Sequence, residues 1–279
     1  MATQGRIERK FQELRARGEA ALIPFIVAGD PDLRHSAMLV TEMEARGADL
    51  IELGVPFSDP MADGPANQRA LARGLAAGAS LSAILGMVGE LRQQTEIPII
   101  LFGYFNPYFR YGCDRLCADA AQAGVDGLLV VDMPPEESAE LAQPARAAGI
   151  DLIYLLAPTT PPERSRAIAN SASGFLYYVS VTGVTGARAQ VGADVEHHVR
   201  ELSAITTLPI GVGFGISTPE QAAQVAVYAD AVVVGSALSL LIETHGGSDR
   251  LLPAVGALVG AMKQAMRAAR RGQPQAASA

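Results

Sequence analysis

Residues 124–131 read GVDGLLVV, and this short stretch, with its copies along the chain, decides the fold. A glycine ends the helical pattern before it, an aspartate follows two positions later, and an apolar run then begins. Glycine takes the left-handed conformation at a helix end without a steric penalty, which lets the chain turn back toward a sheet. The stretch therefore predicts a helix-to-strand loop followed by a buried strand over 128–131.

The arrangement recurs. Residues 47–49 (GAD) and 149–151 (GID) precede apolar runs in the same way, and weaker copies precede two more. Pro24, Pro98 and Pro209 precede three further runs, at a position where a strand loses no ladder N–H. The expected strands are 25–28, 50–53, 99–102, 128–131, 152–156, 175–179, 210–212 and 231–234.

Helical patterns separate these runs, for example over 36–46, 81–93, 136–148, 163–170 and 219–227. Strands that are almost continuously apolar are buried on both faces, as parallel strands joined by crossover helices are. Eight such units in 279 residues predict one α/β domain, a single (β/α)8 TIM barrel. A doubly wound open sheet is the structural alternative, because local pattern does not show whether a sheet closes.

The two ends of the chain show different patterns. Residues 1–17 contain no apolar signal segment and form an amphipathic pattern on Ile7, Phe11 and Leu14, which predicts an extra N-terminal helix. Residues 267–279 are polar and turn-prone, so we expect a disordered tail after a barrel domain over 1–266.

Composition restricts the function classes. Hydrophobic residues make up 49% and charged residues 18%, as in folded globular enzymes. The net charge of −7 argues against a nucleic-acid partner, and the apolar stretch 231–242 is too short and too interrupted to span a membrane. Cys113 and Cys117 lack the second pair that a zinc site requires, so buried thiols in a reducing cytoplasm are the expected reading.

The second expected strand carries an acid in an apolar setting. Burial raises the pKa of a carboxyl group such as that of Glu52 unless a cation pairs with it. Glu52 is therefore a candidate catalytic acid, and the alternative is a purely structural glutamate that pairs with an arginine. The following loop, 54–65, contains Asp59 and Asp63, of which Asp63 could reach back toward Glu52. Two carboxylates in unlike environments can perform acid–base chemistry, whereas turn formation or helix capping is the alternative for either aspartate.

Three successive loops are rich in glycine: 182–186 (TGVTG), 213–217 (GFGIS) and 235–236 (GS). Backbone N–H groups in such loops, with a helix N-terminus behind them, bind phosphate without a cationic side chain. The last two follow the seventh and eighth strands, where barrel enzymes frequently hold phosphate. A dinucleotide fold is excluded because the spacing is not GxGxxG and the loop does not follow the first strand.

Some residue types needed for other chemistries are missing. The only lysines, Lys10 and Lys263, lie in terminal helical segments, so no strand-borne lysine is placed to form a Schiff base. The four histidines lack metal-ligand spacing, and no GxSxG elbow is present. Acid–base chemistry by carboxylates on a phosphorylated small molecule remains.

The run 49–65, DLIELGVPFSDPMADGP, closely resembles the signature of the tryptophan synthase α chain family. Further segments match in order along essentially the whole chain: 24–25, 28–31, 104–107, 131–134, 183–186 and 213–217. The resemblance implies a TIM-barrel lyase of L-tryptophan biosynthesis that cleaves indole-3-glycerol phosphate to indole and glyceraldehyde 3-phosphate. It also implies a pyridoxal-phosphate-containing β chain as partner, in an α2β2 assembly, and no cofactor on this chain.

The resemblance assigns roles residue by residue. Glu52 and Asp63 match the catalytic carboxylates; we expect Glu52 to protonate indole C3, and an ionised Asp63 to stabilise charge at the ring N–H. The resemblance implies a phosphate site formed by Gly186, Phe214, Gly215, Gly235 and Ser236, and an indole pocket lined by Phe25, Tyr104 and Tyr177. It places Thr185 in a loop that closes over the substrate. It places Pro56, Asp59, Asn106 and Pro134 near the surface that faces the β chain. A phosphosugar isomerase or epimerase, and a barrel that serves only as an allosteric subunit, are the competing functions.

Overall fold

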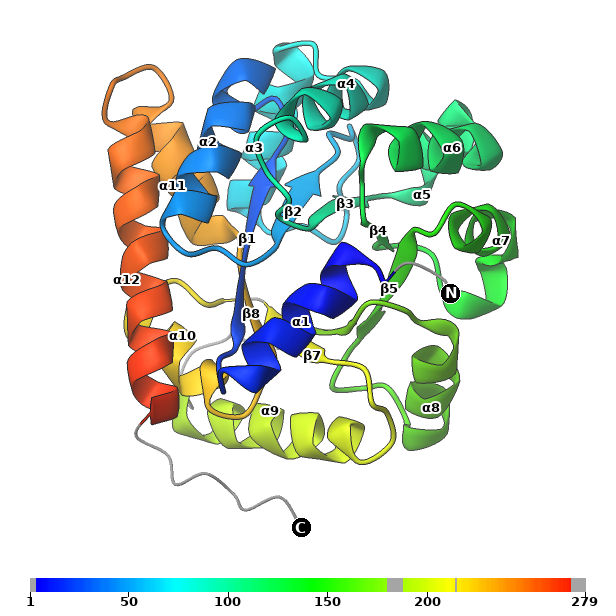
Figure 1. The fold of residues 1–279 in the computed structure, drawn as a ribbon, viewed down its shortest axis with the longest axis vertical. Helices are drawn as coiled ribbons and strands as arrows, with labels where there is room; N and C mark the ends of the chain where they lie inside the picture. The colour runs from blue at the N-terminus through cyan, green and yellow to red at the C-terminus, as the bar shows by residue number, and fades with distance from the viewer. Residues whose placement is uncertain (1–3, 180–187, 214, 272–279) are drawn as a thin grey trace.

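The computed structural model describes residues 4–179, 188–213 and 215–271 and shows a closed barrel of eight parallel strands (Figure 1). Each strand pairs with the next in sequence, and β8 pairs with β1 through Ala21 and Ala231. This last pairing closes the sheet and excludes the open doubly wound alternative. The predicted single TIM barrel with an extra N-terminal helix is confirmed.

All eight expected strands are present, with ends that differ from the expected ones by a few residues at most. They are β1 (Ala21–Val27), β2 (Ile51–Gly54), β3 (Ile99–Gly103), β4 (Gly127–Val130), β5 (Asp151–Leu156), β6 (Leu176–Val179), β7 (Ile210–Gly213) and β8 (Ala231–Val234).

Helices surround the barrel and connect its strands (Figure 1). They are α1 (Arg6–Ala16), α2 (Leu33–Ala45), α3 (Pro65–Ala76), α4 (Leu81–Leu91), α5 (Phe105–Tyr111), α6 (Cys113–Ala123), the 3₁₀ turn η1 (Pro135–Glu137), α7 (Ala139–Ala147), α8 (Pro162–Ser171), α9 (Arg188–Ser203), α10 (Pro219–Ala226), α11 (Ser236–His245) and α12 (Leu251–Arg271). The single helix expected over 136–148 is divided into η1 and α7.

Side chains alternate along each strand between two apolar cores. One core lies between the sheet and the helices, and the other fills the barrel interior. Helix α1 closes one end of the interior with Ile7, Phe11 and Leu14, as the amphipathic pattern predicted, and Phe11 packs 5.7 Å from Phe175 between ring centroids. Figure 1 shows α1 crossing in front of the strands. The candidate functional site lies at the opposite end of the barrel, where the strands terminate.

The glycine–aspartate loops explain how the strands are aligned. Gly47, Gly124 and Gly149 have positive φ angles, as expected for residues that end a helix. The aspartates add a contact that the sequence did not reveal. Asp49 accepts a hydrogen bond from the backbone N–H of Leu22 in β1, and Asp126 accepts one from Ile99 in β3. Each carboxylate thus secures the beginning of the neighbouring strand.

The last helix extends further than expected. The sequence predicts a tail from residue 267, but α12 continues to Arg271. Arg267 pairs with Glu19, and Arg270 donates hydrogen bonds to the carbonyls of Ala226 and Ala229. The remaining tail residues lie outside the described part of the chain. In that part, no single helix meets the length and hydropathy requirements for crossing a membrane; α3 and α4 meet them only as a pair bent by 92°.

Candidate active site

Glu52 lies inside the barrel on the same strand face as Leu50, which belongs to the interior core. Its side chain is completely buried, and neither carboxylate oxygen has a hydrogen-bond partner among the described residues. The alternative of a structural Glu–Arg pair therefore finds no support in this part of the chain. A buried carboxyl without a partner is costly when ionised.

Burial alone raises the pKa of Glu52 from 4.5 to about 8. No neighbouring cation opposes this effect, and desolvation penalises only the charged form. At neutral pH the group is therefore protonated and able to donate a proton into the barrel.

Three aromatic side chains lie around this acid. Phe25 is level with Glu52 in the β1–β2 register, and its ring centroid is 5.0 Å from that of Phe102, which lies 6.4 Å from Tyr177. Glycine makes room for them: a Cβ on Gly213 would lie 1.9 Å from the Tyr177 hydroxyl. Phe25 and Tyr177 were predicted. Phe102 was not, because its place in an apolar strand gives no sign that it faces the site.

Asp63 lies in the loop between β2 and α3, at the open end of the barrel. The Tyr104 hydroxyl donates a hydrogen bond of 2.6 Å to its Oδ2 and accepts one of 3.0 Å from the N–H of Ala62. Burial raises the pKa of Asp63, while hydrogen bonds from Tyr104 and Asn67 act in the lowering direction, and the net pKa is above the ordinary 3.8. Asp63 is thus less exposed than a loop position suggested.

The charges of Glu52 and Asp63 both affect the pKa of one side chain, that of Tyr177. Tyr177 is buried, and its pKa is raised well above 10, first by burial and then by the charges of Glu52 and Asp63. A single phenol is thus within electrostatic reach of the two carboxyl groups, one from the barrel wall and one from the loop above it.

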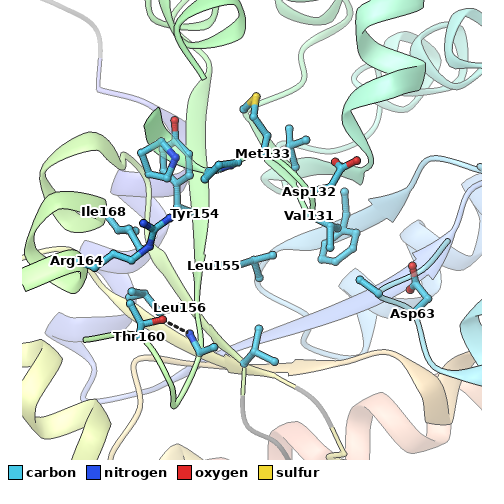
Figure 2. Close-up of a pocket in the computed structure, with 17 residues that line it drawn as sticks. Asp63, Val131, Asp132, Met133, Tyr154, Leu155, Leu156, Thr160, Arg164 and Ile168 are labelled. Carbon is cyan, nitrogen blue, oxygen red and sulfur yellow. Dashed lines mark hydrogen bonds between the residues drawn. The ribbon is translucent and has the colours of Figure 1, made fainter. Parts of the chain in front are cut away.

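A cavity of about 440 Å³ opens beside Asp63. Asp63 lies on one side and Arg164 on the other, with Val131 and Leu155 between them (Figure 2). Its walls come from the ends of β4 and β5, and Phe102 belongs both to these walls and to the interior core around Glu52. The cavity therefore borders the interior core of the barrel at Phe102. It is mostly apolar, which suits an aromatic ring system.

The expected phosphate loops are only partly described. Gly215 follows β7 with a φ of +75° and is exposed, and Gly235 precedes α11, in which Ser236 is the first residue. The first N–H groups of a helix lack intrahelical partners and favour anions. Thr185, Gly186 and Phe214 lie outside the described residues.

The four residues expected on the β-facing surface differ in exposure. Asp59 and Asn106 are exposed, and Pro134 is half-buried at the cavity wall. Pro56 is buried close to Gly74 of α3, so it shapes this surface without presenting its side chain there.

Two large apolar side chains, Met61 and Phe109, are 90% and 54% exposed. Met61 belongs to the loop between β2 and α3, and Phe109 belongs to α5.

The described residues contain no group of three or more His, Cys, Asp or Glu side chains arranged to hold a metal ion. Lys263 lies far from the carboxyl ends of the strands, because its Nζ donates to Ala20 O just before β1.

Comparison with known proteins agrees with this geometry. Residues 11–267 match the family model described as the tryptophan synthase alpha chain. Alpha chains from Citrifermentans bemidjiense and Geobacter sulfurreducens are 55% and 51% identical over 93% and 94% of this chain and 97% and 98% of theirs.

Solved structures agree as well. The alpha subunit from Legionella pneumophila has a TM-score of 0.88 at 41% identity, covering 95% of this chain and 99% of that one. A Mycobacterium tuberculosis tryptophan synthase structure has a TM-score of 0.86 at 36% identity, with the same two coverages. These matches over nearly the full length, on a closed barrel with a buried acid on β2 and a carboxylate in the loop that follows, show that the chain belongs to the tryptophan synthase alpha chain family.

Proposed function

We propose that Glu52 is the general acid, and Asp63 the second carboxylate, of a retro-aldol cleavage. The chain is a carbon–carbon lyase of tryptophan biosynthesis, which cleaves indole-3-glycerol phosphate to indole and glyceraldehyde 3-phosphate. The observation that carries the residue assignment is the complete burial of Glu52 without a described partner, since it keeps a proton on the carboxyl group at neutral pH.

The cleavage needs a place for the electron pair of the breaking bond. Protonation of indole C3 by Glu52 turns the ring into an iminium-like acceptor, so the carbon–carbon bond breaks as electrons return to the ring. The glycerol hydroxyl loses its proton in the same process, and the ionised Glu52 can receive it. General acid–base steps of this kind contribute roughly 10² to 10⁴-fold each.

Asp63 acts on the other side of the ring in this proposal. Its carboxylate, held by Tyr104, stabilises the positive charge that develops at the indole N–H. Phe25 and Tyr177 would contact the ring, and the apolar cavity beside Phe102 supports this placement.

The ester phosphate would bind where β7 and β8 end. Gly215, Gly235 and Ser236 offer main-chain N–H groups there, and Gly186 and Phe214 would complete the site, with Thr185 in the loop that closes over it. The N-terminus of the ten-residue helix α11 supports an anion at this position.

We also propose a partner and a location. A tryptophan synthase β chain would bind around the cavity mouth in an α2β2 assembly, and the exposed Met61 and Phe109, beside Asp59 and Asn106, support this surface. The unpaired, buried thiol of Cys117, one of the chain's two cysteines, fits a reducing cytoplasm.

The test measures indole release from indole-3-glycerol phosphate by the purified chain, with and without a β chain. We expect Glu52→Gln and Asp63→Asn each to reduce kcat by at least about 100-fold, with the fold intact by circular dichroism. Substantial activity in Glu52→Gln would remove this residue from the mechanism. A wild-type chain that isomerises phosphosugars and releases no indole would replace the lyase by the competing isomerase function.

A further inference from the structure

Tyr104 is held from both sides by the segment that follows β4. The carbonyl oxygen of Gly103 accepts a hydrogen bond of 2.9 Å from the N–H of Val131. The N–H of Phe105 donates a hydrogen bond of 2.7 Å to Asp132 Oδ1. These two contacts engage the peptide groups immediately before and after Tyr104. The backbone at the end of β3 is therefore fixed by two consecutive residues of the neighbouring loop.

Asp132 supplies a contact that Tyr104 does not make. Tyr104 is the N-cap residue of α5, but its side chain forms no cap hydrogen bond. At this position a Ser, Thr, Asp or Asn side chain usually accepts a hydrogen bond from the first N–H groups of the helix. The Tyr104 hydroxyl instead donates to Asp63 and accepts from the N–H of Ala62. The acceptor for the first N–H of α5 therefore comes from the loop after β4.

We propose that Asp132 is a positioning residue, which orients Tyr104 and thereby holds the Asp63 carboxylate in place. This inference rests on the proposed role of Asp63. Among the described residues no hydrogen bond joins Asp132 directly to Asp63, so the effect passes through Tyr104. Figure 2 shows both carboxylates on the side of the cavity opposite Arg164.

The orientation of Tyr104 determines where the loop between β2 and α3 lies. Tyr104 is buried, and its ring centroid is 5.2 Å from that of Phe57 in this loop. Its hydroxyl contacts the loop twice, over 2.6 Å to Asp63 Oδ2 and over 3.0 Å to the N–H of Ala62. A change in the backbone at Tyr104 would displace the ring, and these contacts would lengthen together.

The charge of Asp132 and its hydrogen bond have opposite effects on the pKa of Asp63. A nearby negative charge raises the pKa of a carboxyl group, so removing that charge alone would lower the pKa. The hydrogen bond from Tyr104 favours the ionised form of Asp63, so weakening this bond would raise the pKa. The sign of the shift therefore distinguishes positioning from a plain charge effect.

Two phenols and one acid are the titratable groups around Asp63 in the described part of the chain. Burial is the first cause that raises the pKa values of Tyr104 and Tyr177 above the ordinary 10, so both phenols are neutral near pH 7. Glu52, whose charge also acts on Tyr177, holds its proton up to a pKa of about 8. The acid limb of kcat/KM therefore reports the ionisation of Asp63.

The experiment measures kcat, KM and the pH dependence of kcat/KM for indole release by the full chain. We expect Asp132→Ala to move the acid limb to higher pH by about 0.5 to 1 unit and to lower kcat about fivefold near neutral pH. The KM should change less than about twofold, since the phosphate-binding loops are untouched. Asp132→Asn keeps an acceptor for the N–H of Phe105, so its kcat should stay within about twofold of the wild type.

Two further variants locate the effect. Tyr104→Phe removes the donor to Asp63, so adding Asp132→Ala in this background should not move the limb further. Asp32→Ala is the matched control, because Asp32 caps α2 by accepting a hydrogen bond of 2.8 Å from the N–H of His35. Asp32 makes no hydrogen bond to Tyr104 or Asp63 among the described residues. The acid limb of this control should coincide with that of the wild type.

An acid limb of Asp132→Ala that stays in place or moves to lower pH would overturn the inference, as would an equal shift in Asp32→Ala. A further shift in the Tyr104→Phe background would also overturn it, because Asp132 would then act by another route. If Asp132→Ala does not fold, Asp132→Ser replaces it, since the shorter side chain draws the acceptor away from Phe105. An unshifted limb in that variant has the same meaning.

Asp63→Asn separates this inference from the proposed function. Wild-type turnover in that variant would contradict the role of Asp63. An inactive Asp63→Asn beside an unshifted Asp132→Ala would contradict only the role of Asp132.

Discussion

The burial of Glu52 predicts an unusual dependence of stability on pH. Its carboxyl has a pKa of about 8 in the folded chain and an ordinary value of 4.5 when exposed. The folded chain therefore binds more protons than the unfolded chain between these two pH values, and the free energy of unfolding falls as the pH rises through them. Glu52→Gln, which replaces the acid by a neutral side chain of the same shape, should remove this dependence.

The size of the effect follows from the two pKa values. At about 1.4 kcal/mol for each pKa unit, the complete transition corresponds to about 5 kcal/mol, of which about 3 to 4 kcal/mol falls between pH 5 and pH 8. Near pH 5 the wild-type chain and Glu52→Gln should be about equally stable, since both then carry a neutral group. Near pH 8 the inactive variant should be more stable by several kcal/mol.

Urea unfolding at a series of pH values measures this difference, with each transition followed by circular dichroism. All other groups titrate alike in the two proteins, so subtraction isolates Glu52. Glu90→Gln is the matched control, because Glu90 is an exposed glutamate on α4. Its difference from the wild type should stay constant over the same range.

A difference between wild type and Glu52→Gln that stays constant within about 0.5 kcal/mol from pH 5 to pH 8 would refute the reasoning. It would mean that Glu52 ionises normally inside the barrel, and that it holds no proton for indole C3 at neutral pH.

Two further changes test contacts near and far from the site. Tyr104→Phe removes the donor to Asp63, so we expect the acid limb of kcat/KM to move to higher pH, while Tyr111→Phe, which removes a similar bond to a surface carboxylate, should not move it. Lys263→Met leaves Asp49 buried without its cation, and we expect a loss of about 3 to 5 kcal/mol in urea unfolding; a loss below about 1 kcal/mol would contradict the importance of this pair.

Most of the fold could be predicted because its determinants are local. A glycine such as Gly124 ends a helix by its own conformational freedom, and a proline such as Pro98 precedes a strand, so the eight strands could be located one by one. Closure could not be seen in this way, since the β1–β8 pairing joins residues about 210 apart. The role of Asp126 was hidden for the same reason, because the N–H that it binds belongs to another strand.

The site shows the same division. Glu52 could be recognised because an acid in an apolar strand is anomalous by itself, and the loop motif singled out Asp63. Phe102 carries no such anomaly, since a phenylalanine in a strand is ordinary. Its role depends on which residues lie opposite in space. The expectation that the last helix ends before residue 267 failed for a similar reason, because Arg270 binds carbonyls of another segment of the chain.

The isolation of Glu52 follows from what its chemistry requires. An arginine beside it would stabilise the folded chain by pairing with the carboxylate, but it would also lower the pKa and remove the proton at neutral pH. Hydrogen-bond donors would have the same effect to a smaller extent. A general acid on a barrel strand therefore needs apolar neighbours such as Leu50 and Phe25. The free energy lost by burying it is the physical origin of its acidity near pH 8, so a stabilised Glu52→Gln and an inactive one are two results of the same cause.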